Sequence, residues 1–185
     1  YFFNDFTVDL WEKPMNDGVL LANRQKEYDK GAKGWLLFVE NGTLKFRYFP
    51  SNQFNKPTYE PASDEQKTIE GGKLNMGEWA HVAITEKRDG SIRLYVNGML
   101  TGEGERYRRE HTLNNSTYLS LFADAFEYAP IEAAVDELKI WNYELNEEEI
   151  RREMYSVNVD NRNGLVAYYA FNGDNLSGDL ETFAG

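Results

Sequence analysis

The feature that most constrains the fold is the alternation of apolar and polar residues along short segments of the chain. In residues 91–97, Ile92, Leu94 and Val96 share one face of an extended chain, and Arg93 and Tyr95 point the other way. A strand places successive side chains on opposite faces, so this pattern predicts a strand that is buried on one side.

Turn dipeptides bound this strand and recur elsewhere. Asp89-Gly90 precedes it and Asn97-Gly98 follows it, and both pairs can adopt the positive φ angles that two-residue hairpin turns require. Asn41-Gly42 is a third such pair, between the expected strands 34–40 and 43–49. Further strands are expected at residues 6–11, 19–22, 78–85, 118–123, 135–141 and 165–171. Closely spaced strands separated by Gly, Asn and Asp predict a β-sandwich.

Two longer segments interrupt the strands. Residues 50–77 are polar and contain Pro57 and Pro61, so we expect a long loop with one short strand near residues 67–69. Residues 102–115, rich in Arg and Glu, are expected to form a second loop.

One short helix is expected in the C-terminal third of the chain. Asn146 can cap its first turn, and Glu149 stands three residues later as the return half of a capping box. Leu145 and Ile150 can pack against each other across this start. The helix is predicted from about residue 147 to residue 155, and its few apolar positions predict that it packs on the sheet by one edge.

Together these elements predict an all-β protein in which two antiparallel sheets pack as a sandwich with one short helix. The length suits a single domain, residues 1–185, because sandwiches of this size form single units. The strand expected at 165–171 lies close to the end of the sequence. Residues 164–185 therefore either close this sandwich or begin a following segment.

The composition excludes several classes of function. The 31 acidic residues outnumber the 20 basic ones, and the formal charge of −11 repels the phosphate backbone of nucleic acids. No apolar run approaches the roughly 18 residues that span a bilayer. The absence of cysteine excludes disulfides and favours a bacterial source. The sequence starts at Tyr1 without a leader, so we expect a fragment whose export signal or anchor lies outside it.

Four short motifs resemble, in the same order, those of laminin G-like domains. They are Phe6-Thr7-Val8-Asp9-Leu10-Trp11, Gly77-Glu78-Trp79-Ala80-His81-Val82-Ala83, Leu94-Tyr95-Val96-Asn97-Gly98 and Val135-Asp136-Glu137-Leu138-Lys139-Ile140-Trp141-Asn142. This family is related to the pentraxins and to the concanavalin A-like lectins and glucanases. The resemblance implies a jelly-roll sandwich. One departure is residues 164–171, which are similar to a strand that opens many family members but stand here near the end.

Most of the hallmark residues are expected to have structural roles. Trp11, Trp79 and Trp141, at strand ends, are expected to pack in the core, and His81 is expected to be a structural histidine. By simple alternation, Asp136 shares a face with two apolar neighbours. We expect it to be partly buried, with its carboxylate accepting hydrogen bonds from backbone amides.

The resemblance to glucanases is not accompanied by a catalytic motif. Those enzymes present an E-x-D-x-x-E strand, whose alternation gathers three carboxylates on one face. No such strand occurs here, and the sequence also lacks the G-x-S-x-G, H-E-x-x-H and Walker A motifs. We therefore expect no enzymatic activity, and a divergent glycoside hydrolase is the least favoured hypothesis.

The resemblance also implies a calcium site at one end of the sandwich, as in the pentraxin-like members. The corresponding regions of this sequence contain Glu27, Asp29, Asp124 and Glu127, and carboxylates are ligands that calcium prefers. The Gln-Asp run of the pentraxin site is absent. The alternative is that these four residues are solvated loop charges.

Aromatic residues in the expected loops are candidates for ligand binding. Tyr59, Tyr107, Phe126 and Tyr128 lie where the core does not require them, and flat aromatic rings can stack on sugars. The alternative is that these rings clamp the long loops to the sandwich.

The main functional hypothesis is a non-catalytic, carbohydrate-binding recognition module that is extracellular or displayed at the cell surface. Its partner would be a glycan. The alternative is a protein-adhesion or spacer domain, whose partner would be a cell-surface or extracellular protein. Exposed aromatic side chains on one side of the molecule would favour the first hypothesis, and a flat, charged surface would favour the second.

Overall fold

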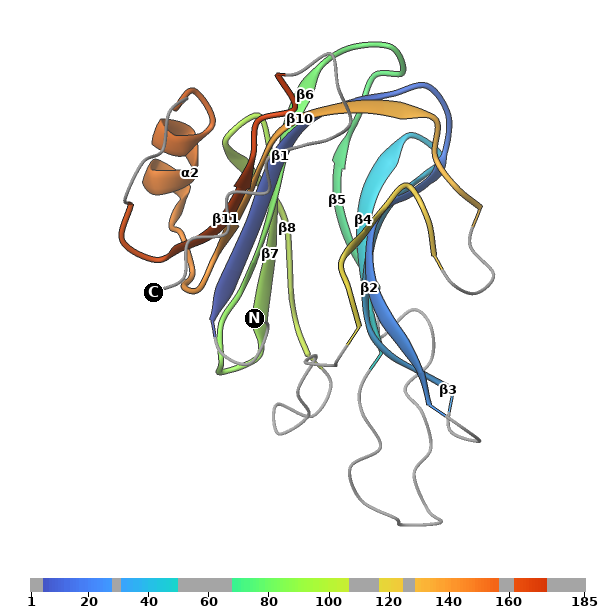
Figure 1. Cartoon of the computed structure of the whole chain (residues 1–185), viewed down its shortest axis with the longest axis horizontal. Helices are drawn as coiled ribbons and strands as arrows, with labels where there is room; N and C mark the ends of the chain where they lie inside the picture. Colours follow the sequence, from blue (N-terminus) through green and yellow to red (C-terminus); the bar gives the residue numbers. More distant parts are fainter. Residues whose placement is uncertain are drawn as a thin grey trace.

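Two antiparallel β-sheets that face each other make up the fold (Figure 1). The computed structural model describes residues 5–27, 31–49, 68–106, 117–124, 129–156 and 162–172. One short helix, α2 (Glu147–Glu153), lies on the outside of the larger sheet. The prediction of an all-β, two-sheet antiparallel sandwich with a short helix is therefore confirmed.

The larger sheet contains the strand at the start of the described chain and the strand at its end. Its six strands lie in the order β11 (Leu165–Tyr169), β10 (Ala133–Trp141), β1 (Phe6–Pro14), β6 (Ala80–Glu86), β7 (Ser91–Val96) and β8 (Met99–Glu105). The five strands of the smaller sheet lie in the order β5 (Thr68–Lys73), β4 (Thr43–Phe49), β3 (Gly31–Glu40), β2 (Gly18–Glu27) and β9 (Ser120–Leu121). Strand β1 pairs with both β6 and β10, so segments distant in sequence meet at the centre of the larger sheet.

The main hydrophobic core fills the space between the two sheets. On β1, Phe6, Val8 and Leu10 belong to this core, and the residues between them face outward. From the smaller sheet, Trp35 stacks against Phe6 with the ring centroids 6.2 Å apart. Burying a side chain of this size stabilises a fold by about 1.5–3 kcal/mol, so the alternating face of each strand supplies the main driving force for the sandwich.

Along one side of the sandwich, the edge strands β5 and β8 approach each other closely. A Cβ atom added at Gly102 on β8 would lie 2.0 Å from the backbone oxygen of Glu70 on β5. A Cβ atom added at Gly104 would lie 2.8 Å from the side chain of Ile69. Glycine is therefore required on β8 for the two sheets to meet here.

Helix α2 packs on the outer face of the larger sheet through a second, smaller core. Leu145 and Ile150 contact Trp141, Ala83 and Tyr95 in this cluster. The predicted capping box is confirmed, because the Asn146 side chain accepts a hydrogen bond from the Glu149 backbone amide and the Glu149 side chain accepts one from the Asn146 amide. The helix ends at Glu153, two residues earlier than expected.

Several expected element boundaries were wrong. The loop expected from residue 102 begins later, because β8 continues the hairpin from the Asn97-Gly98 turn to Glu105. Strand β8 has no apolar alternation, since it is an exposed edge, and pairing with β7 forms it instead. Strand β5 is longer than expected and β9 is shorter. Strand β11, near the end of the sequence, pairs with β10 at the edge of the larger sheet.

Candidate functional site

Most of the residues that the sequence nominated for binding lie outside the described part of the chain. These include Tyr59, Tyr107, Phe126 and Tyr128 of the aromatic set, and Asp29 and Glu127 of the calcium set. Glu27 is the last residue of β2, and its side chain is not described. Asp124 is the one nominated residue whose side-chain contacts the structure gives.

Asp124 forms an ion pair with a residue of β2. Its Oδ2 atom lies 2.6 Å from Nη1 of Arg24, and the Asp124 side chain is fully buried. The Arg24 guanidinium also lies over the Phe49 ring, 3.9 Å from its centroid. Asp124 thus contacts β2 through Arg24, and the guanidinium compensates its negative charge and would repel a metal ion bound at Oδ2.

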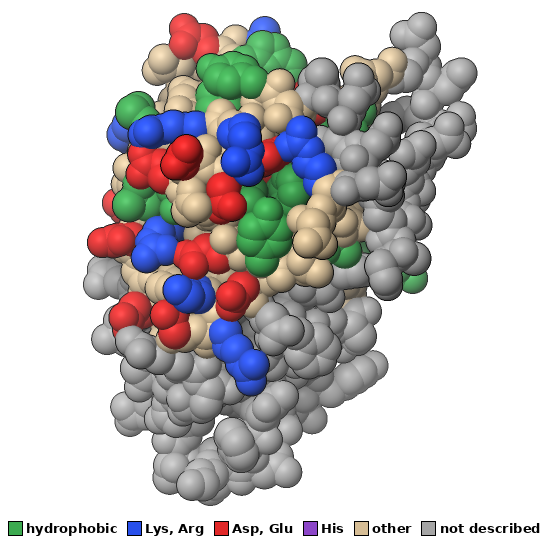
Figure 2. Space-filling model, turned by 90° about the vertical axis from the view of Figure 1, so that its left-hand side faces the viewer, with side chains coloured by type: hydrophobic (Ala, Val, Ile, Leu, Met, Phe, Trp, Pro, Cys, Tyr) green, Lys and Arg blue, Asp and Glu red, His purple; other side chains and the backbone are tan. Residues whose placement is uncertain are grey.

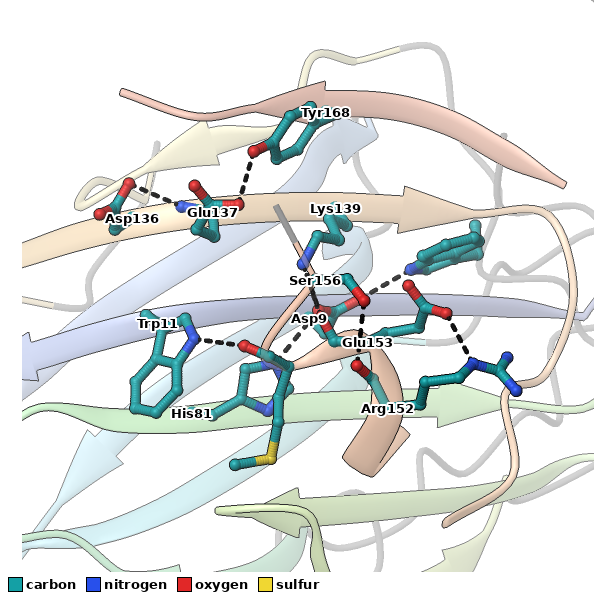
Figure 3. Close-up of polar contacts among 12 residues, drawn as sticks. Asp9, Trp11, His81, Asp136, Glu137, Lys139, Arg152, Glu153, Ser156 and Tyr168 are labelled. Atoms are coloured by element: carbon teal, nitrogen blue, oxygen red, sulfur yellow. Dashed lines mark hydrogen bonds and ion pairs between the residues drawn. The ribbon is translucent and has the colours of Figure 1, made fainter. Parts of the chain in front are cut away.

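A cluster of buried polar side chains lies on the outer face of the larger sheet, beneath the C-terminal end of α2 (Figure 3). We call Asp9, His81, Lys139, Trp141 and Glu153 the anchor cluster. Asp9 is at its centre: Oδ1 lies 3.1 Å from His81 Nε2, and Oδ2 accepts a hydrogen bond of 2.7 Å from Trp141 Nε1. The Lys139 ammonium lies 4.0 Å from Asp9 Oδ1 and balances its charge.

The anchor cluster also holds the end of the helix. Lys139 Nζ donates a hydrogen bond of 2.9 Å to the Glu153 carbonyl, and Trp11 Nε1 donates one of 2.8 Å to the Met154 carbonyl. The last carbonyl groups of a helix lack partners within the helix, and a cation near them is favourable. The Glu153 carboxylate is bound by Arg152 and Arg162, which ties α2 to the segment before β11.

The anchor cluster stabilises the fold and is inaccessible to a substrate. Each of its five residues is at most 2% exposed, so no substrate could reach His81 or Asp9 without displacement of α2. The prediction that His81 is structural is thereby confirmed, as is the core position of Trp141.

A β-bulge in β10 places Asp136 differently from the sequence expectation. The register of β10 against β1 shifts between Asp9 and Trp11, and Glu137 has a positive φ of 53°. Asp136 therefore lies opposite Trp11 on the outer face and does not share a face with the core residues Leu138 and Ile140. The carboxylate is half-buried and accepts a hydrogen bond from the Glu137 amide, as predicted for a backbone partner.

Two acidic side chains are buried toward the inner face of the larger sheet. Burial raises the pKa of Glu12 to about 7, and neither of its carboxyl oxygens has a hydrogen-bond partner among the described residues. Burial also raises the pKa of Glu86 to about 8, although the Arg106 guanidinium 2.7 Å away opposes this rise.

Glu12 and Glu86 are too far apart to act together on one glycosidic bond. Glu12 lies opposite Ala80 on β6, and Glu86 is six residues further along that strand. At about 3.3 Å per residue, this separation is roughly 20 Å, whereas catalytic carboxylates of glycosidases are about 5 to 10 Å apart.

Large aromatic side chains reach the solvent at four described positions. The exposed fraction is 46% for Trp79, 90% for Tyr118, 74% for Tyr155 and 47% for Phe171. The prediction that Trp79 packs in the core was wrong, because this residue precedes the first residue of β6 and is not covered by another element. Tyr155 could have been suspected from the sequence, since it falls just beyond the last apolar position of the helix, Met154.

No group of three or more His, Asp or Glu side chains in the described ranges is arranged to hold a metal ion. In that same part of the chain, no helix has the length and apolar character needed to cross a membrane.

Solved structures with a similar fold include binding proteins. A Bacteroides ovatus protein whose assigned role is carbohydrate binding superposes with a TM-score of 0.67 at 16% identity, over 94% of this chain and 47% of that one. The binding domain of botulinum neurotoxin DC in complex with SialylT gives a TM-score of 0.58 at 14% identity, over 83% and 36%. A native heptameric SAP-like pentraxin from Limulus polyphemus gives 0.57 at 18% identity, over 80% and 69%. These identities show a shared fold, and this chain spans less than half the length of the first two.

The sequence itself also matches a known family. A search of curated protein sequences finds no match for this chain. A family model for laminin G-like domains, described as the concanavalin A-like lectin/glucanases superfamily, matches residues 2–151. The matched segment contains all four motifs noted in the sequence and ten of the eleven described strands. The chain therefore belongs to the concanavalin A-like lectin/glucanase superfamily.

Proposed function

We propose that this chain is a non-catalytic recognition module that binds carbohydrate. The observation that carries the proposal is the set of aromatic side chains left 46% to 90% exposed: Trp79, Tyr118, Tyr155 and Phe171. Burying an aromatic ring is strongly favourable, so a fold that leaves several of them in water has surface suited to stacking on a ligand. Sugar rings are ligands of this kind, with an apolar face and a rim of hydroxyl groups.

The comparisons support a binding role at a general level. The Bacteroides ovatus protein and the neurotoxin domain are binding proteins by name, and the neurotoxin domain has been captured both with SialylT and with rat synaptotagmin II. We extend carbohydrate binding from these proteins to this chain as part of the proposal. An extracellular or cell-surface location belongs to the same proposal, since glycans are displayed there.

The absence of catalysis is part of the proposal and has a physical basis. The two acids buried toward the inner face are about 20 Å apart by strand length, and the anchor cluster is closed to substrate. We therefore expect the purified chain to bind glycans without cleaving them. Release of reducing ends from a bound glycan would contradict this part.

A glycan array probed with the purified, fluorescently labelled chain tests the proposed function. We expect binding to a restricted set of glycans, competed by the same glycans in free solution. A labelled chain carrying Trp79→Ala, Tyr118→Ala, Tyr155→Ala and Phe171→Ala serves as the control, since its sheets and anchor cluster are intact. If the unmodified chain binds no glycan on the array, the carbohydrate proposal is wrong.

A protein-adhesion role is the second candidate function. On the side of the molecule that carries α2, acidic and basic side chains are interspersed with hydrophobic ones (Figure 2). Such a mixed surface is typical of transient contacts between proteins. An array without a glycan signal would favour this function over the first.

The calcium site stays a prediction. Of its four carboxylates, that of Asp124 is poorly suited to bind a metal ion through Oδ2, because the Arg24 guanidinium lies 2.6 Å from this atom. The same glycan array, run with calcium and with EGTA, tests whether binding requires the metal. Equal signals in both conditions would show that glycan binding does not depend on calcium.

A further inference from the structure

Three aromatic residues gather at one end of the outer face of the larger sheet. Tyr155, which follows α2, packs on Trp11 of β1, with the ring centroids 6.2 Å apart and an interplanar angle of 49°. Trp11 in turn contacts the edge of His81, with a centroid separation of 5.6 Å. Trp79 directly precedes β6, whose first residue, Ala80, faces the core and pairs with Glu12 of β1. If the alternation continues one residue beyond the strand, Trp79 lies on the outer side.

Trp11 is held in place by the end of α2 and by His81 of the anchor cluster. Trp11 is fixed by its hydrogen bond to the Met154 carbonyl, directly before Tyr155, and by its edge-on contact with the His81 ring beside it (Figure 3). His81 is itself paired with Asp9. Rings that are already ordered in the free protein lose little conformational freedom when a ligand stacks on them. Trp79 and Tyr155 nevertheless remain 46% and 74% exposed.

One cationic and one anionic side chain lie beside these rings. Lys13 is two residues after Trp11 on β1, and its ammonium has no hydrogen bond or ion pair with any other described residue. Asp136 lies directly opposite Trp11 on β10, and its Oδ1 atom accepts a hydrogen bond from a backbone amide. The surface therefore offers a cationic donor and an anionic acceptor next to exposed aromatic faces.

We propose that Trp79, Trp11 and Tyr155, with Lys13 and Asp136 beside them, form the glycan-binding platform of this module. A hexopyranose ring fits this chemistry, because its C–H face stacks on an aromatic ring while its hydroxyl groups both accept and donate hydrogen bonds. A nucleic acid does not fit a chain with a net charge of −11, and Lys13 would repel a cationic ligand. The inference rests on the proposed carbohydrate function and assigns its site.

The test compares variants of exposed aromatic residues in different places. The probe is the soluble form of the glycan that the unmodified chain binds most strongly on the array, and its affinity is measured by isothermal titration calorimetry. Trp79→Ala and Tyr155→Ala should each weaken binding about tenfold or more. Trp79→Phe should retain a large part of the affinity, because it keeps an aromatic face. Tyr118→Ala tests another of the four exposed rings, since Tyr118 is 90% exposed and lies next to β9 of the smaller sheet, and the platform predicts unchanged affinity. Glu103→Ala, at an exposed position on β8, is the control outside this aromatic set.

The outcomes separate the site from the function. Melting temperatures of all the variants should stay close to that of the unmodified chain, because the substituted rings are exposed. Unchanged affinity in Trp79→Ala and Tyr155→Ala, or a loss confined to Tyr118→Ala, would overturn the platform and leave carbohydrate binding intact. A chain that binds no glycan on the array would overturn both.

Discussion

At the scale of single residues, Glu12 is in an environment that disfavours its charge. Its side chain is fully buried, and its cross-strand neighbours are Ala80 and Val135. An ionised carboxylate without a partner in such a place is costly, which is why burial raises the pKa of Glu12 to about 7. Burial also raises the pKa of Glu86, to about 8, but Glu86 has an ion-pair partner in Arg106 that Glu12 lacks among the described residues.

This pKa predicts how stability depends on pH. Between the unfolded pKa of 4.5 and the folded value of about 7, the folded chain keeps a proton on Glu12 that the unfolded chain has lost. The protonated Glu12 side chain therefore contributes fully to the free energy of unfolding below pH 4.5. This free energy falls by about 3 kcal/mol as the pH rises from 4.5 to 7. Glu12→Gln should match the parent near pH 4 and be more stable at pH 8. Urea denaturation at both pH values, with Glu132→Gln as an exposed control, checks this. The prediction is wrong if the free energies of unfolding of the parent and of Glu12→Gln differ by the same amount at both pH values.

Some residue positions could be predicted from the sequence and others could not. His81 was predicted to be structural because no second histidine stands near it in the sequence, and Trp141 was predicted to be buried because it is a large apolar residue at a strand end; both side chains are buried. Asp136 was assigned to the wrong face because one bulge inverts the alternation, and no residue pattern announces where a bulge falls. Trp79 was assigned to the core because its residue type favours burial, whereas its exposure depends on which elements cover the end of the sheet.

At the scale of elements, the start of α2 depends on its capping box. Asn146→Ala removes the acceptor for the Glu149 amide and should lower the free energy of unfolding by about 1 kcal/mol. Glu148→Gln is the control, because Glu148 lies in the same turn but outside the box. Chemical denaturation of both variants measures the difference. An Asn146→Ala variant as stable as the parent would show that water replaces the cap without cost.

The contact between β5 and β8 predicts a second effect. Gly102→Ala places a methyl group against the Glu70 carbonyl, so the two edge strands must separate. We expect a loss of about 1–3 kcal/mol in the free energy of unfolding, as for other overpacked sites. Glu103→Ala, on the exposed side of the same strand, should change little. Equal stability of the two variants would contradict the requirement for glycine at position 102.

The elements that could be predicted from the sequence are those that short-range chemistry determines. The capped helix and the hairpin turns follow from short-range chemistry, so residues such as Asn146 and the Asn97-Gly98 pair reveal them. Strand β8 carries no apolar alternation and forms through pairing with β7, which only the assembled sheet shows. A strand that pairing alone forms, such as β8, is therefore the kind of element that local patterns miss.

At the scale of the whole molecule, the order of the strands predicts slow folding. Thr7 pairs with Trp141, so the centre of the larger sheet cannot form until segments distant in sequence meet. Domains dominated by such contacts fold in milliseconds to seconds. Stopped-flow refolding followed by tryptophan fluorescence, with buried Trp35 and Trp141 as reporters, should show this range. Refolding in microseconds would contradict it.

The proposed binding platform also exists only at the scale of the whole molecule. Its residues come from β1, from β10, from the position just before β6 and from the segment just after α2. The motifs around Trp11, Trp79 and Asp136 indicated a fold, but only the strand order brings them to one end of one face. The sequence could therefore predict the architecture in which the platform lies and not the platform itself.

The close approach of β5 and β8 also bears on aggregation. An edge strand usually presents unpaired backbone groups to which a strand of another chain can add. Here the backbone of β5 lies against β8, and the charged residues Glu103 and Glu105 face outward along the same edge. An incoming strand meets both a steric and an electrostatic barrier on this side. By allowing this close approach, glycine at position 102 should disfavour strand addition along this edge of the sandwich.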